Sequence, residues 1–340
     1  MMELLITLIM LAFIEAVLAA VVCVLAGIAA MSGHRFRKAV SAGMWILVIP
    51  PLVTAYGTLI GRNAYMTVPV DIVSGDIPEN FDGYRIVHIS DLHLSSFRSR
   101  HRSLEKAVEK INRLEPDLIA MTGDLITFSP SEIDGCDTIL SRLDARDGVF
   151  SVLGNHDYCI YDRRSKRKAT QDVVEKVIAA ERELGWHVML NGHTDIIRGN
   201  DTISIIGVEN TSASDRFPSY GNLRKATEGA CGRFKILLSH DPTHWRMEVA
   251  GKSDIGLTLS GHTHAMQMSV FGWSPSSLIY DEHRGLYEYC NTDKESTAGD
   301  NRQYLYVNIG LGETGFPARI GARPEITVIT LHSASHEGKQ

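Results

Sequence analysis

Val152–Asp157, with the sequence VLGNHD, joins a short apolar run to three polar side chains that can bind metal ions, protons or phosphate. The apolar run contains a β-branched residue and predicts a buried strand. Gly154 lets the backbone turn sharply where this strand ends. Because α/β sheets carry functional residues at the ends of strands, the stretch predicts chemistry at Asn155, His156 and Asp157.

Four more predicted strands end in side chains of the same kind. They lead into Asp91-Leu92-His93, Gly123-Asp124, His240 and Gly261-His262-Thr263-His264. Asp91 and His93 stand two residues apart at a strand end, so their side chains point to the same side and can share an ion. The Asp124 carboxylate has two oxygens and can bridge two ions, which an imidazole cannot do. Each piece alone is common, but their joint occurrence at five strand ends predicts one metal site.

The predicted metal ligands are Asp91, His93, Asp124, Asn155, His240, His262 and His264. They combine carboxylate, carboxamide and imidazole groups and include no thiolate. Such a set suits Mn²⁺, Fe or Zn²⁺ better than Cu(I) or an iron–sulfur cluster. The five cysteines lie far apart without a Cys-x-x-Cys pair, which argues against a structural zinc site or a thioredoxin-like motif.

Apolar strands alternate with amphipathic helices after residue 83. Strands are predicted over 84–90, 117–122, up to 154, 188–190, 194–198, 202–208, 235–239, 257–260, 304–309 and 325–331, and helices over about 103–114, 131–143, 171–184 and 241–249. An edge strand is predicted within 67–77. The alternation indicates a largely parallel sheet with right-handed crossovers. Strands in both halves predict an α/β fold in which two β-sheets pack face to face with helices outside.

Two apolar runs precede this region. Residues 4–31 are interrupted only by Glu15 and exceed the roughly 20 residues that span a bilayer, so they predict a transmembrane helix. A signal peptide is the competing interpretation. However, Glu3 stands where a signal peptide usually has basic residues, and the apolar run is longer than the apolar region of a signal peptide. Residues 44–60 form a second, shorter run in which Pro50-Pro51 predicts a kink.

Basic residues are unevenly placed around the two apolar runs. His34, Arg35, Arg37 and Lys38 lie between them, whereas only Arg62 follows the second run closely. By the positive-inside bias, the link between the runs is cytoplasmic and the membrane-anchored C-terminal domain lies outside the cytoplasm. The formal net charge of -6 gives no overall basic footprint, so no nucleic-acid partner is expected.

The five motifs, in this order, resemble those of the calcineurin-like metallophosphoesterase superfamily over about residues 84–331. The pattern G-x-P-x-R-x-G-x-R over 315–323 and the apolar anchor resemble the membrane-attached bacterial branch. Ala265-Met266 depart from the two glycines often found there. Together these features predict a membrane anchor over 1–61, a linker and edge strand over 62–83, a metallophosphoesterase domain over 84–332 and a tail over 333–340.

The resemblance also implies which side chains hold two divalent ions. Asp91, His93, Asp124 and His264 would hold the first, and Asp124, Asn155, His240 and His262 the second. Mn²⁺ is the preferred ion, with Fe or Zn²⁺ as alternatives. The implied fold is a four-layer sandwich of two mixed β-sheets flanked by helices, preceded by two transmembrane helices.

The implied reaction is hydrolysis of a phosphoester or phosphoanhydride bond by a metal-bridging hydroxide, which needs no protein nucleophile. His156 would be the general acid for the leaving oxygen, and Asp157 would orient its ring and keep it charged. Arg319 and Arg323 are predicted to bind the substrate phosphate, although Arg323 can equally be structural.

The substrate is expected to be a lipid-linked phosphate or diphosphate, because the anchor holds the site near a bilayer. Basic clusters at 98–102 and 163–168 would then face anionic headgroups, or are solvated loops. A phosphodiesterase acting on a soluble or cell-wall phosphodiester is the alternative. A metal-binding membrane sensor without catalysis is the alternative from a different class, disfavoured because every expected ligand position holds a competent side chain.

Overall fold

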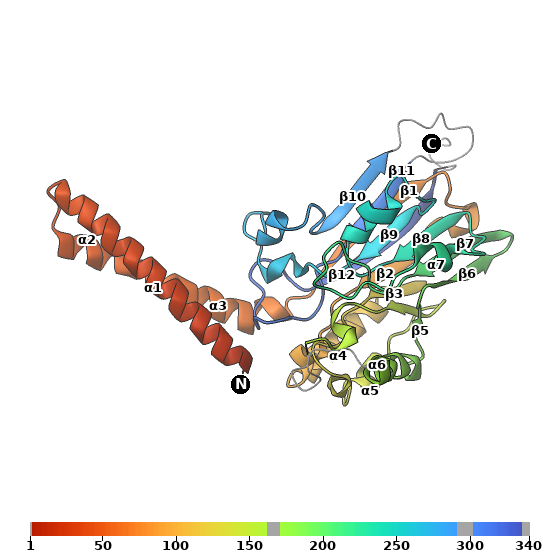
Figure 1. Ribbon diagram of the computed structural model, residues 1–340, viewed down its shortest axis with the longest axis horizontal. Coiled ribbons are helices and arrows are strands. Elements are labelled where there is room, and N and C mark those ends of the chain that lie inside the picture. The colour runs from red at the N-terminus through yellow and green to blue at the C-terminus, as the bar shows by residue number, and fades with distance from the viewer. Residues whose placement is uncertain (1, 162–170, 291–301, 335–340) are drawn as a thin grey trace.

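The computed structural model describes residues 2–161, 171–290 and 302–334. Within these ranges the chain forms two helical stretches at the N-terminus and a larger α/β domain (Figure 1). The predicted basic cluster at 163–168 and the end of the predicted tail lie outside the described residues.

Both apolar runs are helical. α1 covers Met2–Met31, and the second stretch consists of α2 (Phe36–Gly43), η1 (Met44–Val48) and α3 (Ile49–Leu59). Thr7–Met31 and Phe36–Asn63 are each long and apolar enough to cross a bilayer, so the chain has two candidate membrane spans. Pro50 and Pro51 lie in the first turn of α3, where a missing N–H breaks no helical hydrogen bond. The prolines begin α3 directly after the 3₁₀ segment η1, which interrupts the α-helical geometry of the second stretch.

The first sheet has the strand order β1-β12-β2-β3-β4-β5. Its strands are β1 (Met66–Ser74), β2 (Arg85–Ile89), β3 (Leu118–Thr122), β4 (Val149–Val152), β5 (His187–Val188) and β12 (Glu325–Ser333). β2 to β5 run parallel to one another, whereas β12 runs antiparallel to β2. β1 pairs with β12 at the edge of the sheet, where the sequence predicted an edge strand.

The second sheet has the order β10-β11-β9-β8-β7-β6. Its strands are β6 (Gly192–Arg198), β7 (Asp201–Gly207), β8 (Phe234–Leu238), β9 (Leu257–Ser260), β10 (Gly285–Cys290) and β11 (Arg302–Val307). The four inner strands are parallel, and the two edge strands are antiparallel to their neighbours. β10 has no counterpart among the predicted strands, because none of its side chains is fully buried and the apolar signal is weak.

Helices cover the outer faces of the two sheets. On the first lie α4 (His101–Asn112), α5 (Asp137–Leu140) and α6 (Gln171–Glu183), and on the second α7 (Leu223–Thr227) and the π-helical turn η8 (Trp245–Val249). The helix predicted near 131–143 is reduced to the 3₁₀ turn η5 (Pro130–Glu132) and the short α5. Gly135 between them has a φ of 80°, a left-handed conformation that interrupts a helix.

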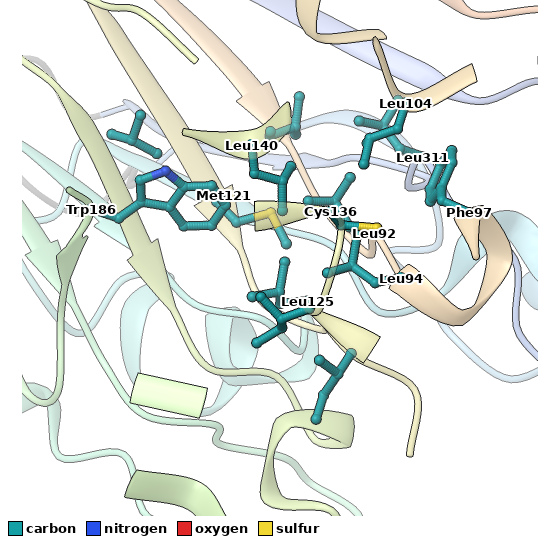
Figure 2. Close-up of a cluster of buried hydrophobic side chains, with 14 of the residues drawn as sticks. Leu92, Leu94, Phe97, Leu104, Met121, Leu125, Cys136, Leu140, Trp186 and Leu311 are labelled. Carbon is teal, nitrogen blue, oxygen red and sulfur yellow. The ribbon is translucent and has the colours of Figure 1, made fainter. Parts of the chain in front are cut away.

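Alternate side chains of the inner strands pack on opposite faces of each sheet. In β3, Leu118 and Ala120 pack between the two sheets, whereas Ile119 and Met121 pack against the helices. Figure 2 shows the cluster under the helices, with Leu104 of α4 among its members. The layers therefore run helix, sheet, sheet, helix, and the predicted sandwich of two mixed sheets with flanking helices is confirmed.

Candidate metal centre

Five strand ends converge at one edge of the sandwich. Asp91 and His93 follow β2, Asp124 follows β3, Asn155 follows β4, His240 follows β8, and His262 and His264 follow β9. These strands are parallel within their sheets, and the sheets pack face to face. Their carboxyl ends therefore bring all seven predicted ligands together.

A first group of donor atoms lies around His93. Its Nε2 is 3.0 Å from Nε2 of His264 and 3.6 Å from Oδ2 of Asp124. Nε2 of His264 is in turn 3.2 Å from Oδ1 of Asp91. One donor atom from each of Asp91, His93 and His264 lies within 4.8 Å of the other two, and all three residues are buried. Imidazole and carboxylate donors at this spacing fit the coordination of one divalent ion.

A second group lies around His240. Its Nε2 is 3.2 Å from Oδ2 of Asp124, 3.2 Å from Oδ1 of Asn155 and 3.2 Å from Nδ1 of His262. Nδ1 of His240 donates a hydrogen bond to the Thr122 carbonyl at 2.7 Å. Because a carbonyl only accepts, this bond fixes the proton on Nδ1 of the neutral ring and leaves Nε2 free to bind an ion.

Asp124 lies between the two groups. Its Oδ2 faces both His93 and His240, while Oδ1 accepts a hydrogen bond from the His156 backbone N–H at 2.8 Å. This is the position that a bridging carboxylate requires. Burial alone would raise the pKa of Asp124, but the imidazoles of His240 and His156 outweigh it and hold that pKa well below its usual value. The carboxylate is therefore ionised.

The imidazoles of the two groups differ in their protonation. Burial lowers the pKa of His93 well below its usual value, and burial also lowers the pKa of His262. These two rings are therefore neutral, which is the form that binds metal ions. Burial acts in the same direction on His240, but the charge of Asp124 outweighs it and raises the pKa of His240 to about 10. An ion bound at Nε2 of His240 would take the place of that proton.

Five of the seven predicted ligands have a left-handed backbone conformation. The φ angles are 51° at Asp91, 42° at His93, 56° at Asp124, 73° at His262 and 50° at His264. Residues other than glycine rarely adopt this conformation, which costs on the order of 1 to 3 kcal/mol each and is found mainly where function requires it. The clustered strain marks this edge as a functional site independently of the side-chain chemistry.

His156 and Asp157 lie beside the donor groups but do not contact each other in the way the sequence predicted. Nδ1 of His156 donates to the Thr127 carbonyl at 2.7 Å. Asp157 is fully buried and accepts hydrogen bonds from three backbone N–H groups, at 2.8 Å from Asp124 and Gly154 and 3.1 Å from Ile126. The prediction that Asp157 orients the His156 ring is wrong, because neighbouring side chains of the 3₁₀ turn η6 (His156–Tyr158) point in different directions.

Asp157 instead ties together the loops that carry Asp124 and Asn155. Burial and the negative charge of Asp124 raise the pKa of Asp157 to about 7, although its backbone hydrogen bonds oppose this shift. Asp157 is therefore a positioning residue for two predicted ligands.

The two arginines predicted to bind substrate contact the protein backbone. The Arg319 guanidinium is fully buried and donates to the carbonyls of Ile309, Gly312 and Ala322 at 3.0 to 3.2 Å. Its Nη2 lies 3.4 Å from Nδ1 of His264. Nε of the exposed Arg323 donates to the Ala64 carbonyl at 2.8 Å, ahead of β1. Neither side chain lines the pocket described below. The prediction that Arg319 binds substrate is therefore wrong. Arg323 has a structural contact, which is the alternative that the sequence left open for it.

Four of the seven predicted ligands line a pocket of about 370 Å³, namely Asp124, Asn155, His262 and His264. Its remaining wall includes the aromatic or apolar side chains of Tyr161, Phe217, Met266, Tyr280 and Phe316. Among the described residues that line it, none is a lysine or an arginine. The Tyr280 hydroxyl lies 3.0 Å from Nε2 of His262 and so also positions a predicted ligand. The sequence did not predict these wall residues, because they come from loops that carry no motif.

The two-sheet sandwich presents carboxylate, carboxamide and imidazole donors at five strand ends, a set that suits divalent metal ions. The family model for the calcineurin-like phosphoesterases matches residues 84–266, more than half of the 340 residues, and the chain belongs to this family. The chain is therefore a metallophosphoesterase of a family that uses divalent metal ions.

Similar proteins come from bacteria and vertebrates. The chain is 32% identical to a Bacillus subtilis (strain 168) protein described as the uncharacterized metallophosphoesterase YkuE, over 90% of this chain and 99% of that protein. It is 29% identical to a Danio rerio protein described as a transmembrane protein with metallophosphoesterase domain. That match covers 90% of this chain but only 65% of the length of the zebrafish protein. Among solved structures, the NAD nucleotidase NadN of Haemophilus influenzae is 15% identical, with a TM-score of 0.43 over 67% of this chain and 45% of that chain.

Proposed function

We propose that the chain hydrolyses phosphoester or phosphoanhydride bonds with two divalent ions, Mn²⁺ in preference to Fe or Zn²⁺. The position of Asp124 carries this proposal, because its Oδ2 lies 3.6 Å from Nε2 of His93 and 3.2 Å from Nε2 of His240. One carboxylate oxygen thereby reaches both donor groups, as a two-ion site requires. The first ion would be held by Asp91, His93, Asp124 and His264, and the second by Asp124, Asn155, His240 and His262.

His156 is proposed to protonate the leaving oxygen. When bound, the two ions would supply an activated water and neutralise charge on the phosphate. Nδ1 of His156 is engaged by the Thr127 carbonyl, so Nε2 is the nitrogen that can exchange a proton with the substrate. The ring lines the pocket and stacks on Tyr161, with ring centroids 4.2 Å apart. Thr127 and Tyr161 therefore hold the ring, a task that the sequence had assigned to Asp157.

The proposed substrate is a lipid-linked phosphate or diphosphate. Two candidate membrane spans hold the domain beside a bilayer. The pocket wall offers aromatic and apolar side chains beside the donor atoms, which favours an ester with an apolar group next to the phosphate. A soluble or cell-wall phosphodiester without an apolar group would gain less from contact with these side chains.

The α/β domain is proposed to lie outside the cytoplasm. Arg35, Arg37 and Lys38 lie at the start of the second candidate span, next to its link with the first, whereas only Arg62 lies at its far end. We expect a C-terminal alkaline phosphatase fusion to be active in cells and a C-terminal green fluorescent protein fusion to remain dark. A fluorescent fusion with an inactive phosphatase would place the domain in the cytoplasm instead.

Adding divalent ions back to the metal-free protein tests the proposed function. The full chain, purified in detergent and treated with a chelator, is expected to lose hydrolysis of every phosphate ester in a panel of monoesters, diesters and nucleotide-diphosphate lipids. We expect Mn²⁺ to restore kcat/KM best among Mn²⁺, Zn²⁺, Fe²⁺ and Mg²⁺, and the lipid-linked substrates to give the highest values. Hydrolysis that survives complete metal removal would overturn the proposal. A protein that binds metal but hydrolyses nothing in the panel would be the sensor considered above.

A further inference from the structure

Residues 266–279, here called the rim loop, follow the last predicted ligand, His264, and expose apolar side chains. Seven of the eleven large apolar side chains exposed on the described α/β domain belong to this loop. Phe271 is fully exposed, Leu278 is 77% exposed and Trp273 is 52% exposed. Exposed apolar residues that gather in one place mark a surface that meets a partner or a membrane.

The rim loop is held in place by the backbone on which it rests. The Ser269 N–H donates to the Ile320 carbonyl at 2.8 Å, and the Ile320 N–H donates to the Gln267 carbonyl at 2.9 Å. The Ser274 hydroxyl donates to the Ala265 carbonyl at 2.6 Å. These hydrogen bonds present the apolar side chains in a defined direction.

The same segment on which the rim loop rests also contacts α3. The Arg319 N–H donates to the Gly57 carbonyl at 3.2 Å, and a Cβ on Gly57 would lie 3.0 Å from side-chain atoms of Ala318 and Ile320. A Cβ on Gly61 would overlap the Arg319 carbonyl. The end of α3 therefore packs directly on residues 318–320, and only glycine permits so close an approach.

This contact fixes the height of the rim loop relative to a bilayer. Gly57 lies six residues before Asn63, the last residue of the second candidate span, so it lies about 9 Å inside the end of that span at 1.5 Å per residue. The headgroup layer on each side of a bilayer is about 5 to 8 Å thick. At this depth, Gly57 and residues 318–320 that contact it lie at the inner limit of the headgroup layer, where it meets the acyl chains, and the rim loop lies beside them. Figure 1 shows the coils between β9 and β10 on the side of the domain where α3 ends.

We propose that the rim loop inserts its apolar side chains into the membrane interface beside α3, so that the metal pocket opens at the bilayer surface. Its exposed aromatic and aliphatic side chains, with a tryptophan among them, suit the boundary between headgroups and acyl chains. Met266 belongs both to the rim loop and to the pocket wall, so the apolar surface is continuous from the bilayer to the predicted ligands. A lipid-borne substrate can then reach the site without leaving the membrane. The membrane contact stands on its own, whereas this route for the substrate rests on the proposed function.

Tryptophan fluorescence in liposomes tests the contact in the full chain. Of the four tryptophans, Trp45 lies in the second candidate span, and Trp186 and Trp245 are buried in the α/β domain at 4% exposure each. In a Trp45→Phe background, phosphatidylcholine with brominated acyl chains is expected to quench part of the emission relative to ordinary phosphatidylcholine. The quenching should vanish in the Trp45→Phe/Trp273→Phe protein. Equal emission in the two lipids would overturn the proposal. A protein dimer that forms through Phe271, detected by cross-linking, and that keeps lipid away from Trp273 would also overturn it.

Hydrolysis by a charged variant tests the route for the substrate. Phe271→Glu/Leu278→Glu is expected to lower turnover of a phosphate ester carried in vesicles at least tenfold and to leave turnover of a water-soluble ester within twofold. Ile197→Glu/Met247→Glu, which places the same two charges at apolar positions that are 69% and 40% exposed outside the rim loop, is the matched control and should change neither. If the proposed function fails, neither ester is hydrolysed while the quenching persists. If the membrane contact fails, the soluble ester is hydrolysed while the quenching is absent.

Discussion

Replacing Asp124 by asparagine is expected to lower kcat at least about a thousandfold, because a two-ion site contributes several kcal/mol to the stabilisation of transition-state charge. Oδ2 of Asp124 faces His93 on one side and His240 on the other. An asparagine keeps the shape of this side chain but offers one neutral oxygen in place of an ionised carboxylate. A neutral carboxamide oxygen lacks the negative charge that holds two cations at one shared ligand.

The control for Asp124→Asn is Asp71→Asn. Asp71 lies on β1 with a side chain that is 72% exposed, so the same change of charge occurs far from the predicted ligands. We expect its kcat to stay within twofold of the unmodified protein. Circular dichroism should show that both variants are folded. An Asp124→Asn protein with more than a tenth of the normal kcat would show that the two donor groups do not depend on a shared carboxylate.

Replacing His156 by alanine is expected to lower kcat by about a hundredfold to ten-thousandfold on an ester with a poor leaving group, the range usual for lost general acid catalysis. Turnover of a nitrophenyl ester should fall much less, because a nitrophenolate leaves without being protonated. The metal content of the variant should be unchanged. Steady-state kinetics on the two esters, with metal analysis of the same samples, makes the comparison.

A different outcome for His156→Ala would assign the residue another role. A ring nitrogen of His156 lies within 4.8 Å of donor atoms of His93 and Asp124, so the ring is close enough to share an ion with them. Equal losses on both esters, together with loss of metal, would make His156 a ligand.

The predicted ligands could be found from sequence because their positions follow from strand direction alone. Side chains at the carboxyl ends of parallel strands meet at one edge, and two sheets packed face to face double the number that can meet. Asp91 and His264 are 173 positions apart in the chain, yet the packing of the sheet that holds β2 against the sheet that holds β9 brings their side chains to 3.2 Å. The same reasoning predicted the order of layers.

The roles of Asp157 and Arg319 could not be predicted in this way. Adjacency to His156 in sequence does not show where the Asp157 carboxylate points within a 3₁₀ turn, and the structure directs it to three backbone N–H groups. Arg319 carries a charge that suits phosphate, but its burial depends on contacts with the segment 309–322 and with α3. The rim loop likewise shows no strand or helix periodicity, so its exposed face becomes visible only in the fold.

The most direct test of the shared-carboxylate site is the number of divalent ions retained by the purified full chain. Protein is loaded with excess Mn²⁺ and then passed through a desalting column. Elemental mass spectrometry should then find two ions per chain. Asp124→Asn should retain at most one. An unmodified, folded and loaded chain that retains one ion or none would contradict the account.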